Sequence, residues 1–195
     1  MQIIAGAPTP PLSPYDVDIV ILSLDRVEET LAAIGSALAQ RGVTRHVFVV
    51  DQGSRPENLA RLAAAVAGRS DATLARLDRN HGVAGGRNRG SALGQGRIIV
   101  ALDNDAEFDG PDTLARAVTV MDEQPDVATL AFRIVVFADG RDDLSSWGYP
   151  QSLLPRAGEA FDTVTFVGAG HAIRRAAGSA RSVCHSTPLR APRTR

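Results

Sequence analysis

The chain has 195 residues, a length typical of one domain, and its 44% apolar and 22% charged residues are typical of a globular protein. No apolar run approaches the roughly 18 residues that a membrane-spanning helix needs, and no basic segment precedes an apolar one near the amino terminus, so we expect a cytoplasmic protein. All 21 basic residues are Arg, which excludes a Walker A phosphate loop and Schiff-base chemistry because both need Lys. The single Cys184 excludes an internal disulfide and a multi-cysteine zinc site.

The net charge of −1 hides an asymmetry along the chain. The last acidic residue is Asp162, and six Arg lie in the final 22 residues, so this end carries +6 and the rest −7. Residues 178–195 (GSARSVCHSTPLRAPRTR) have no apolar period, and we expect a basic irregular tail. It is either a native segment that binds anions or a membrane surface, or the result of a truncation or frameshift.

The remaining elements follow in chain order. Residues 1–15 hold four prolines and are expected to form an extended lead-in. Buried-type apolar runs predict strands at Val17–Ser23, His46–Val50, Thr73–Leu77, Arg97–Leu102, Val127–Phe137 and Thr163–Val167. Helical periodicity predicts helices over Glu28–Gln40, over the segment from Leu59 to Val66, and from Pro111 to Glu123. The alternation predicts one α/β domain over residues 16–177, with a Rossmann-like three-layer α/β/α arrangement and a mostly parallel central sheet.

Acidic residues follow three of the predicted strands. They are Asp25 after Ser23 and Leu24, Asp51 after the second strand, and the Asp103-Asn104-Asp105 motif. Because the carboxyl ends of parallel strands share one edge of a sheet, these loops should form one site. Two carboxylates two residues apart offer hard oxygen ligands to Mg²⁺ or Mn²⁺ and leave coordination positions for a diphosphate. We therefore predict that Asp103 and Asp105 hold a divalent metal beside a nucleotide.

Two further segments can contact a nucleotide. Asp51, followed by Gln52-Gly53-Ser54, either caps the next helix or points its carboxylate at a base or ribose. The Gly-rich segment from Asn80 to Asn88 does not fit the dinucleotide-binding fingerprint G-x-G-x-x-G. It is either a flexible turn or a means of bringing a helix N-terminus and Arg87 close to a phosphate.

The motifs VDIVILSLDR, VFVVDQGS, NHGVAGGRNRG, IIVALDNDAEF and FVGAGHAIRR, in this order, resemble family 2 glycosyltransferases with the GT-A fold. The resemblance covers about Asp16 to Arg175. It implies a donor-binding region made of Ser23, Asp25, Asp51, Gly82, Arg87, Asp103 and Asn104. It further implies that Asp105 is the principal metal ligand, with Asp103 beside it, and that Gly168, Ala169 and Gly170 lie by the transferred sugar and the acceptor. Leu24 replaces an aromatic residue that stacks on the base in this family.

The resemblance implies transfer of a sugar from a nucleoside diphosphate sugar to an acceptor hydroxyl or amine, with inversion and with help from Mg²⁺ or Mn²⁺. The acceptor would be a glycan, a lipid or a small molecule. No nucleic acid partner is expected, and the location would be the cytoplasm or the inner face of the membrane. The family's catalytic base lies downstream of GAGHAIRR, yet no Asp or Glu follows Asp162. Two alternatives therefore stay open: a remnant that binds nucleotide sugars without transfer, and a nucleotidyltransferase.

Overall fold

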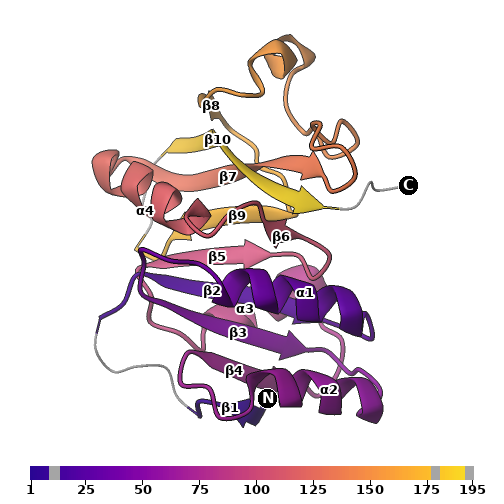
Figure 1. The fold of residues 1–195 in the computed structure, drawn as a ribbon. Helices are drawn as coiled ribbons and strands as arrows, with labels where there is room; N and C mark the ends of the chain where they lie inside the picture. Colours follow the sequence, from indigo (N-terminus) through magenta and orange to yellow (C-terminus); the bar gives the residue numbers. More distant parts are fainter. Residues whose placement is uncertain (9–13, 177–180, 192–195) are drawn as a thin grey trace.

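A computed structural model describes residues 1–8 and 14–176, together with the backbone of residues 181–191. These residues form one mixed sheet with helices on both faces (Figure 1). The strand order is β1-β4-β3-β2-β5-β9-β7-β10-β6, and β8 pairs with β10. The predicted α/β class is confirmed.

The centre of the sheet is a run of parallel strands. It consists of β2 (Val17–Ser23), β3 (Arg45–Asp51), β4 (Ala72–Arg76) and β5 (Ile98–Leu102). β2 pairs with β3 on one side and β5 on the other, and β3 pairs with β4. Helices cover both faces of these strands, which explains why their sequences are continuous apolar runs. Their carboxyl ends, where the predicted acids stand, meet at one edge.

Three helices cover one face of the sheet: α1 (Val27–Leu38), α2 (Pro56–Val66) and α4 (Thr113–Glu123). Acidic residues in the first turn of α1 and a proline at the start of α2 favour helix initiation there. Apolar side chains of all three helices pack with alternate residues of β2 in one core. A membrane-spanning helix is not found among the described residues, since each helix there is too short or too polar for one.

The opposite face is covered by α3 (Gly82–Ser91), which the Gly-rich segment forms. This helix packs on β2 and β3 through buried glycines rather than through large side chains. A Cβ atom added to Gly90 would lie 2.5 Å from Cγ1 of Val20, and one added to Gly86 would lie 3.0 Å from Cδ2 of Leu22. The glycines therefore allow the backbone of α3 to approach the sheet closely.

The other half of the sheet is largely antiparallel. β9 (Gly170–Arg174) lies antiparallel between β5 and β7 (Val127–Val136). Beyond β7 lies β10 (Arg181–Ala191), which pairs with both β6 (Glu107–Phe108) and β8 (Phe161–Thr163). A short 3-10 helix, η1 (Gln151–Arg156), precedes β8. The predicted strand over Thr163–Val167 is wrong, because the central strand begins only at Gly170. Thr163 is the last residue of β8, and its Oγ1 accepts a hydrogen bond from Thr165 N at 3.1 Å, so a local turn ends the strand there.

Both ends of the chain add a strand to the sheet. Within residues 1–15, β1 (Gln2–Gly6) pairs antiparallel with β4 and covers that edge of the sheet. Within residues 178–195, β10 (Arg181–Ala191) pairs parallel with β7, so the prediction of an irregular tail is wrong for this segment. The remaining residues, 178–180 and 192–195, lie outside the described residues. An open strand edge pairs through backbone groups, which an absent apolar period does not prevent.

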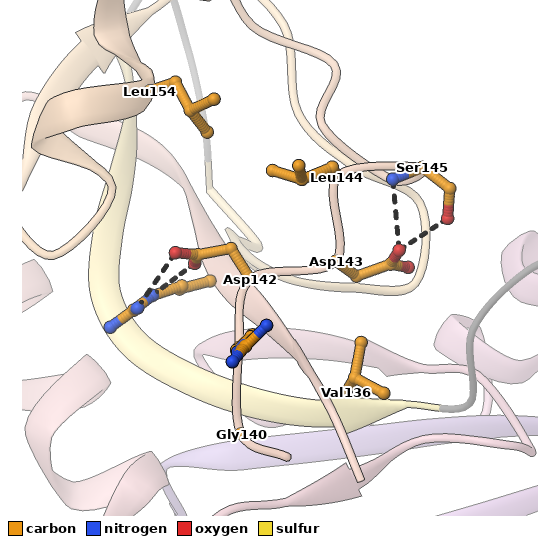
Figure 2. Close-up of a pocket in the computed structure, with 9 residues that line it drawn as sticks. Val136, Gly140, Asp142, Asp143, Leu144, Ser145 and Leu154 are labelled. Atoms are coloured by element: carbon orange, nitrogen blue, oxygen red, sulfur yellow. Dashed lines mark hydrogen bonds and ion pairs between the residues drawn. The ribbon is translucent and has the colours of Figure 1, made fainter. Parts of the chain in front are cut away.

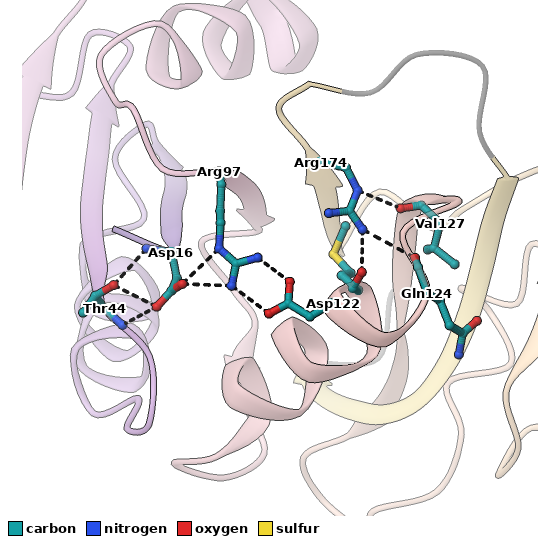
Figure 3. Close-up of polar contacts among 8 residues, drawn as sticks. Asp16, Thr44, Arg97, Asp122, Gln124, Val127 and Arg174 are labelled. Atoms are coloured by element: carbon teal, nitrogen blue, oxygen red, sulfur yellow. Dashed lines mark hydrogen bonds and ion pairs between the residues drawn. The ribbon is translucent and has the colours of Figure 1, made fainter. Parts of the chain in front are cut away.

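Arginines join the elements at the amino-terminal edge of the sheet (Figure 3). Arg97, just before β5, donates to Asp16 from Nε at 3.0 Å and forms a bidentate pair with Asp122 of α4. Arg174, at the end of β9, donates to the carbonyl oxygen of Met121 at 2.6 Å. This contact satisfies a carbonyl in the last turn of α4, where the helix dipole favours a cation.

A second cluster at the same edge is built around Asp18, which is fully buried. Its carboxylate accepts hydrogen bonds from Tyr15 Oη and Arg175 Nη2, and from Gly96 N at 3.1 Å. Burial raises the pKa of the Asp18 carboxyl, against the opposing effects of Tyr15 and Arg175. Burial and the bond to Asp18 also raise the pKa of Tyr15 to about 12. This cluster lies far along the strands from the acid-bearing edge and holds the starts of β2 and β5 together.

Candidate functional site

The carboxyl edge of the parallel strands holds a cleft of about 290 Å³. Its lining comes from the ends of β2, β3 and β5 and from the starts of α1 and α3: Leu22, Ser23, Leu24, Arg26, Gln52, Val83, Asp103 and Asn104. Three residues predicted for donor binding, Ser23, Asp103 and Asn104, are thus brought together in one cleft. The remaining predicted residues lie around it.

A buried hydroxyl group fixes two of these loops to each other. Thr30 of α1 is fully buried, and its Oγ1 lies 3.3 Å from Ser23 Oγ and 3.4 Å from Asn104 Nδ2. The same hydroxyl donates to the carbonyl oxygen of Arg26 at 2.6 Å. Thr30 therefore sets the end of β2 against the Asp103-Asn104-Asp105 turn. It was not predicted from the sequence, where it is only one polar residue in the first turn of a helix.

Asp25 holds the loop after β2 and does not line the cleft. Its backbone is left-handed, with φ of 59°, which is uncommon for a residue other than glycine. Its Oδ1 accepts hydrogen bonds from Arg55 N at 2.8 Å and from Asn58 Nδ2 at 3.0 Å, and these bonds lower the pKa of the Asp25 carboxyl. The side chain therefore caps the start of α2 from outside the helix.

Asp51 is fully buried at the end of β3, also outside the cleft lining. Its carboxylate accepts hydrogen bonds from Gly53 N at 3.2 Å and Ser54 N at 3.1 Å. Arg76 Nε lies 3.5 Å from its Oδ2. Asp51 therefore engages the turn that follows β3 rather than capping α2, which begins at Pro56. Its predicted contact with a base or ribose stays a prediction, and the neighbouring residue lines the cleft.

That neighbour, Gln52, was missed by the sequence analysis although it directly follows the strand-ending acid. It lines the cleft, and its Oε1 accepts a hydrogen bond from His81 N at 3.0 Å, which joins the end of β3 to the start of α3. Gly82, with φ of 70°, is the first residue of α3 and is exposed beside the cleft. Val83 follows and lines the cleft with 59% of its surface exposed.

Arg87 links the acid motif to the segment before β9. Its Nη2 donates to Asp103 Oδ1 at 2.6 Å and to the carbonyl oxygen of Gly168 at 2.8 Å. Asp103 N donates to the carbonyl oxygen of Ala169 at 3.0 Å, and Gly170 pairs with Leu102 in the sheet. Gly168, Ala169 and Gly170 are therefore placed beside Asp103. Their predicted part in acceptor binding remains a prediction.

The two acids of the motif have different surroundings. Burial raises the pKa of the Asp103 carboxyl; Arg87 opposes this rise, and the nearby Asp105 adds to it. Asp105 accepts a hydrogen bond from Arg26 Nη1 at 2.6 Å. It lines a second hollow of about 270 Å³ together with Glu29, Ala32, Glu107 and Phe137.

The acid pair fits a divalent metal in ligand chemistry. Carboxylate oxygens are what Mg²⁺ and Mn²⁺ prefer, and a cation between the acids would relieve their mutual repulsion. In the described part of the chain, no three His, Cys, Asp or Glu side chains are grouped so that they could hold a metal. A metal bound here would therefore take most of its ligands from outside the protein, such as a diphosphate and water.

A cavity larger than the cleft lies elsewhere among the described residues, beside the end of β7 (Figure 2). It has a volume of about 760 Å³ and is lined by Arg133, Val136, Leu144, Leu154 and residues 140–143 and 145. Arg133 forms a bidentate pair with Asp142, with distances of 2.6 and 3.1 Å. None of the predicted donor-binding residues lines this cavity, so its size does not make it the donor site.

The family model described as Glycosyl transferase family 2 matches residues 18–180. The succinoglycan biosynthesis protein ExoO of Rhizobium meliloti (strain 1021) is 38% identical over 130 residues, which cover 65% of this chain and 35% of ExoO. ExoU of the same organism is 28% identical over 75% of this chain and 45% of ExoU. The chain thus spans less than half the length of these curated relatives.

Solved structures share the fold at low sequence identity. The mannosyltransferase PcManGT from Pyrobaculum calidifontis, in complex with GDP-Man and Mn²⁺, matches with a TM-score of 0.61 and 18% identity, over 87% of this chain and 47% of that one. S. aureus TarS 1-349 matches with a TM-score of 0.61 and 19% identity, over 82% of this chain and 47% of that one. These matches establish the GT-A fold.

Proposed function

The chain belongs to glycosyl transferase family 2, and from this we propose that it transfers a sugar from a nucleoside diphosphate sugar to an acceptor hydroxyl or amine, with inversion at the sugar carbon. One observation carries the proposal. Asp103 and Asn104 at the end of β5 line the same cleft as Ser23 and Gln52 at the ends of β2 and β3. A parallel α/β sheet binds its ligands at this edge.

The residues of the cleft suggest how the donor lies. Leu24 and Val83 are partly exposed apolar residues that line it, and we assign them to the two faces of the base. Ser23 and Gln52 supply polar groups for the nucleoside. Asp25 and Asp51 act indirectly in this proposal, since their carboxylates hold the loops that carry these groups.

Asp105 and Asp103 would hold Mg²⁺ or Mn²⁺ at the diphosphate. Such an ion, when bound, acts as a Lewis acid that neutralises the departing diphosphate. Arg87 orients Asp103 for this task and adds a fixed positive charge at the phosphate end of the cleft. The presence of GDP-Man and Mn²⁺ in the PcManGT complex supports this assignment by analogy of fold.

We place the acceptor on the side of β9, next to Gly168, Ala169 and Gly170. Arg133, Asp142 and Asp143 line both the 760 Å³ cavity and a small void of about 10 Å³ that reaches Val167, beside Gly168. The void has room for about one water at most, so an acceptor would reach Gly168 from the surface rather than through it. The acceptor in this proposal is a glycan, a lipid headgroup or a small molecule. A location in the cytoplasm or at the inner face of the membrane belongs to the same proposal.

The test compares two acids on the same chain. Binding of UDP, GDP and dTDP is measured by calorimetry with and without Mn²⁺, for the wild type, Asp105→Asn and Asp112→Asn. Asp112 is an exposed acid at the start of α4, paired with Arg116 and outside the cleft, and serves as the control. We expect Mn²⁺-dependent binding of at least one nucleotide, weakened at least about ten-fold by Asp105→Asn and unchanged by Asp112→Asn, because losing a metal ligand removes a charge-assisted contact.

Equal binding with and without Mn²⁺ would contradict the proposed role of the acids. Release of nucleoside diphosphate from a panel of nucleotide sugars is then measured, because it distinguishes an enzyme that transfers the sugar from a domain that only binds the donor. Metal-dependent binding without turnover on any donor would favour the domain that binds without transfer. Pyrophosphate release from a nucleoside triphosphate and a sugar phosphate would instead indicate a nucleotidyltransferase.

A further inference from the structure

Arg26 lies between the cleft and the acid predicted to bind metal. It is the residue that precedes α1, and it lines the cleft that we assign to the donor. Its Nη1 donates to Asp105 Oδ2 at 2.6 Å, and its Nε lies 3.7 Å from Glu29 Oε1. Asp105 faces the neighbouring acidic hollow, so the guanidinium group neutralises this carboxylate from the cleft side.

On the basis of the function proposed above, we propose that Arg26 exchanges partners when the donor binds. In the free protein it neutralises Asp105. When the donor enters, the guanidinium group transfers to the diphosphate and leaves Asp105 available as a metal ligand. The juxtaposition of Arg26, Asp105 and the cleft carries this inference, because a divalent cation and a guanidinium group repel each other at one carboxylate.

The energetics of the contact permit such an exchange. The Arg26 side chain is 54% exposed. Exposed ion pairs of this kind shift an equilibrium by about five-fold at most, so breaking one is a small obstacle. A phosphate offers the same bidentate geometry to a guanidinium group as a carboxylate does. Among the described residues the side-chain partners of Arg26 are the carboxylates of Asp105 and Glu29, and no backbone acceptor anchors its guanidinium group.

Arg87 provides an internal contrast. It pairs with the other acid of the motif, Asp103, but its side chain is only 16% exposed and it also donates to the carbonyl oxygen of Gly168. Its position is therefore fixed by two elements. Of the two arginines at the acid motif, Arg26 alone is free to move between an acid and a ligand.

The exchange predicts positive coupling between metal and nucleotide. The metal takes Asp105 from the Arg26–Asp105 pair, and the nucleotide takes Arg26. The binding of one ligand therefore favours the binding of the other, and the coupling is reciprocal. Without nucleotide, Arg26 competes with the metal for Asp105. Removing the guanidinium group should therefore strengthen the binding of metal alone and weaken the coupling.

The experiment measures Mn²⁺ binding by the loss of the free-ion EPR signal, for the wild type, Arg26→Gln and Arg61→Gln. Arg61→Gln is the matched control. Arg61 is an exposed arginine of α2 that pairs at 2.6 Å with Glu28 of α1, the helix that Arg26 precedes, and its loss changes the net charge equally. We expect Arg26→Gln to bind Mn²⁺ alone about two- to five-fold more tightly than the wild type, and Arg61→Gln to match the wild type. With saturating UDP or GDP, the gain in Mn²⁺ affinity should be larger in the wild type and in Arg61→Gln than in Arg26→Gln.

Equal Mn²⁺ affinities in the wild type and Arg26→Gln, including no binding by either, would overturn the inference and leave the pair as a structural tie. Thermal melting of each variant shows whether it is folded, and Arg26→Lys provides a second variant that keeps the charge without the planar group. Failure of the proposed function has a different signature. In that case no nucleoside diphosphate raises the Mn²⁺ affinity of any variant, and Asp105→Asn leaves it unchanged.

Discussion

Replacement of two helical glycines by alanine should change stability in opposite directions. Gly90 of α3 is buried, and a Cβ atom there would lie 2.5 Å from Cγ1 of Val20 and 2.9 Å from Cγ2 of Val50. Both valines are buried in the central strands, and their β-branched side chains have few alternative rotamers. Gly35 of α1 is exposed, and a Cβ atom there would have nothing within 4 Å.

The magnitudes follow from two terms. Alanine in place of glycine inside a helix gains about 0.5–1 kcal/mol, and this term applies to both variants. Overpacking a well-packed core costs about 1–3 kcal/mol, and only Gly90→Ala meets this cost. Gly35→Ala should therefore be stabilising by about 0.5–1 kcal/mol. The difference in unfolding free energy between the two variants, about 1–3 kcal/mol, reports the close approach of α3 to the sheet.

The assay is urea unfolding followed by far-UV circular dichroism and by fluorescence of the single tryptophan, Trp147. Coincident transitions justify a two-state free energy. In a chain of this size a difference of 1 kcal/mol corresponds to a shift of about 2–4 °C in melting temperature. Equal stabilisation by Gly35→Ala and Gly90→Ala would refute the reasoning, since α3 would then lie too far from Val20 and Val50 for its glycines to be needed.

Two other predictions concern buried ionisable groups. Burial lowers the pKa of His46 to about 4, so folding favours its neutral form; the stability from this group is complete above pH 6.5 and is lost as the pH falls toward 4. Urea unfolding between pH 7 and pH 4 should show a loss of up to about 3 kcal/mol that His46→Phe reduces, and an unchanged slope in this variant would contradict the assignment. Arg175→Leu should cost about 3–5 kcal/mol because it leaves the buried Asp18 carboxylate without its cation, whereas Asp18→Asn, which buries no charge, should cost less. The reverse order in unfolding free energies would show that Arg175 does not compensate Asp18.

The central strands and the acids at their ends could be predicted because both are local patterns. A continuous apolar run such as Val17–Ser23 indicates a strand covered on two faces, and an acid directly after it falls at the ligand-binding edge. Which neighbour faces the cleft could not be predicted in the same way. Asp51 and Gln52 are adjacent, and only the turn geometry that engages the Asp51 carboxylate leaves Gln52 to line the cleft.

The strand after the Gly168-Ala169-Gly170 segment shows where local propensity fails. Thr163–Val167 is rich in β-branched residues and was predicted as a strand, whereas Gly170–Arg174 forms the central strand β9. Two strands flank β9, and the small, fully buried Ala172 lies opposite Val100 and Leu130. Strand preference depends on such partners more than on the residue itself, so pairing with β5 and β7 decides where the strand lies.

The pairing of the motif acids with arginines was likewise out of reach of the sequence, because Arg26 and Asp105 are 79 positions apart. The chemistry of arginine gives their contact a consequence. A guanidinium group stays protonated at every pH a protein tolerates, so no change of pH near neutrality releases Asp105 from its partner. A competing cation at the carboxylate, or a competing anion at Arg26, shifts the pair toward its separated state. A nucleoside diphosphate with a divalent metal supplies both together, which is why availability of Asp105 should follow the arrival of the donor rather than the pH.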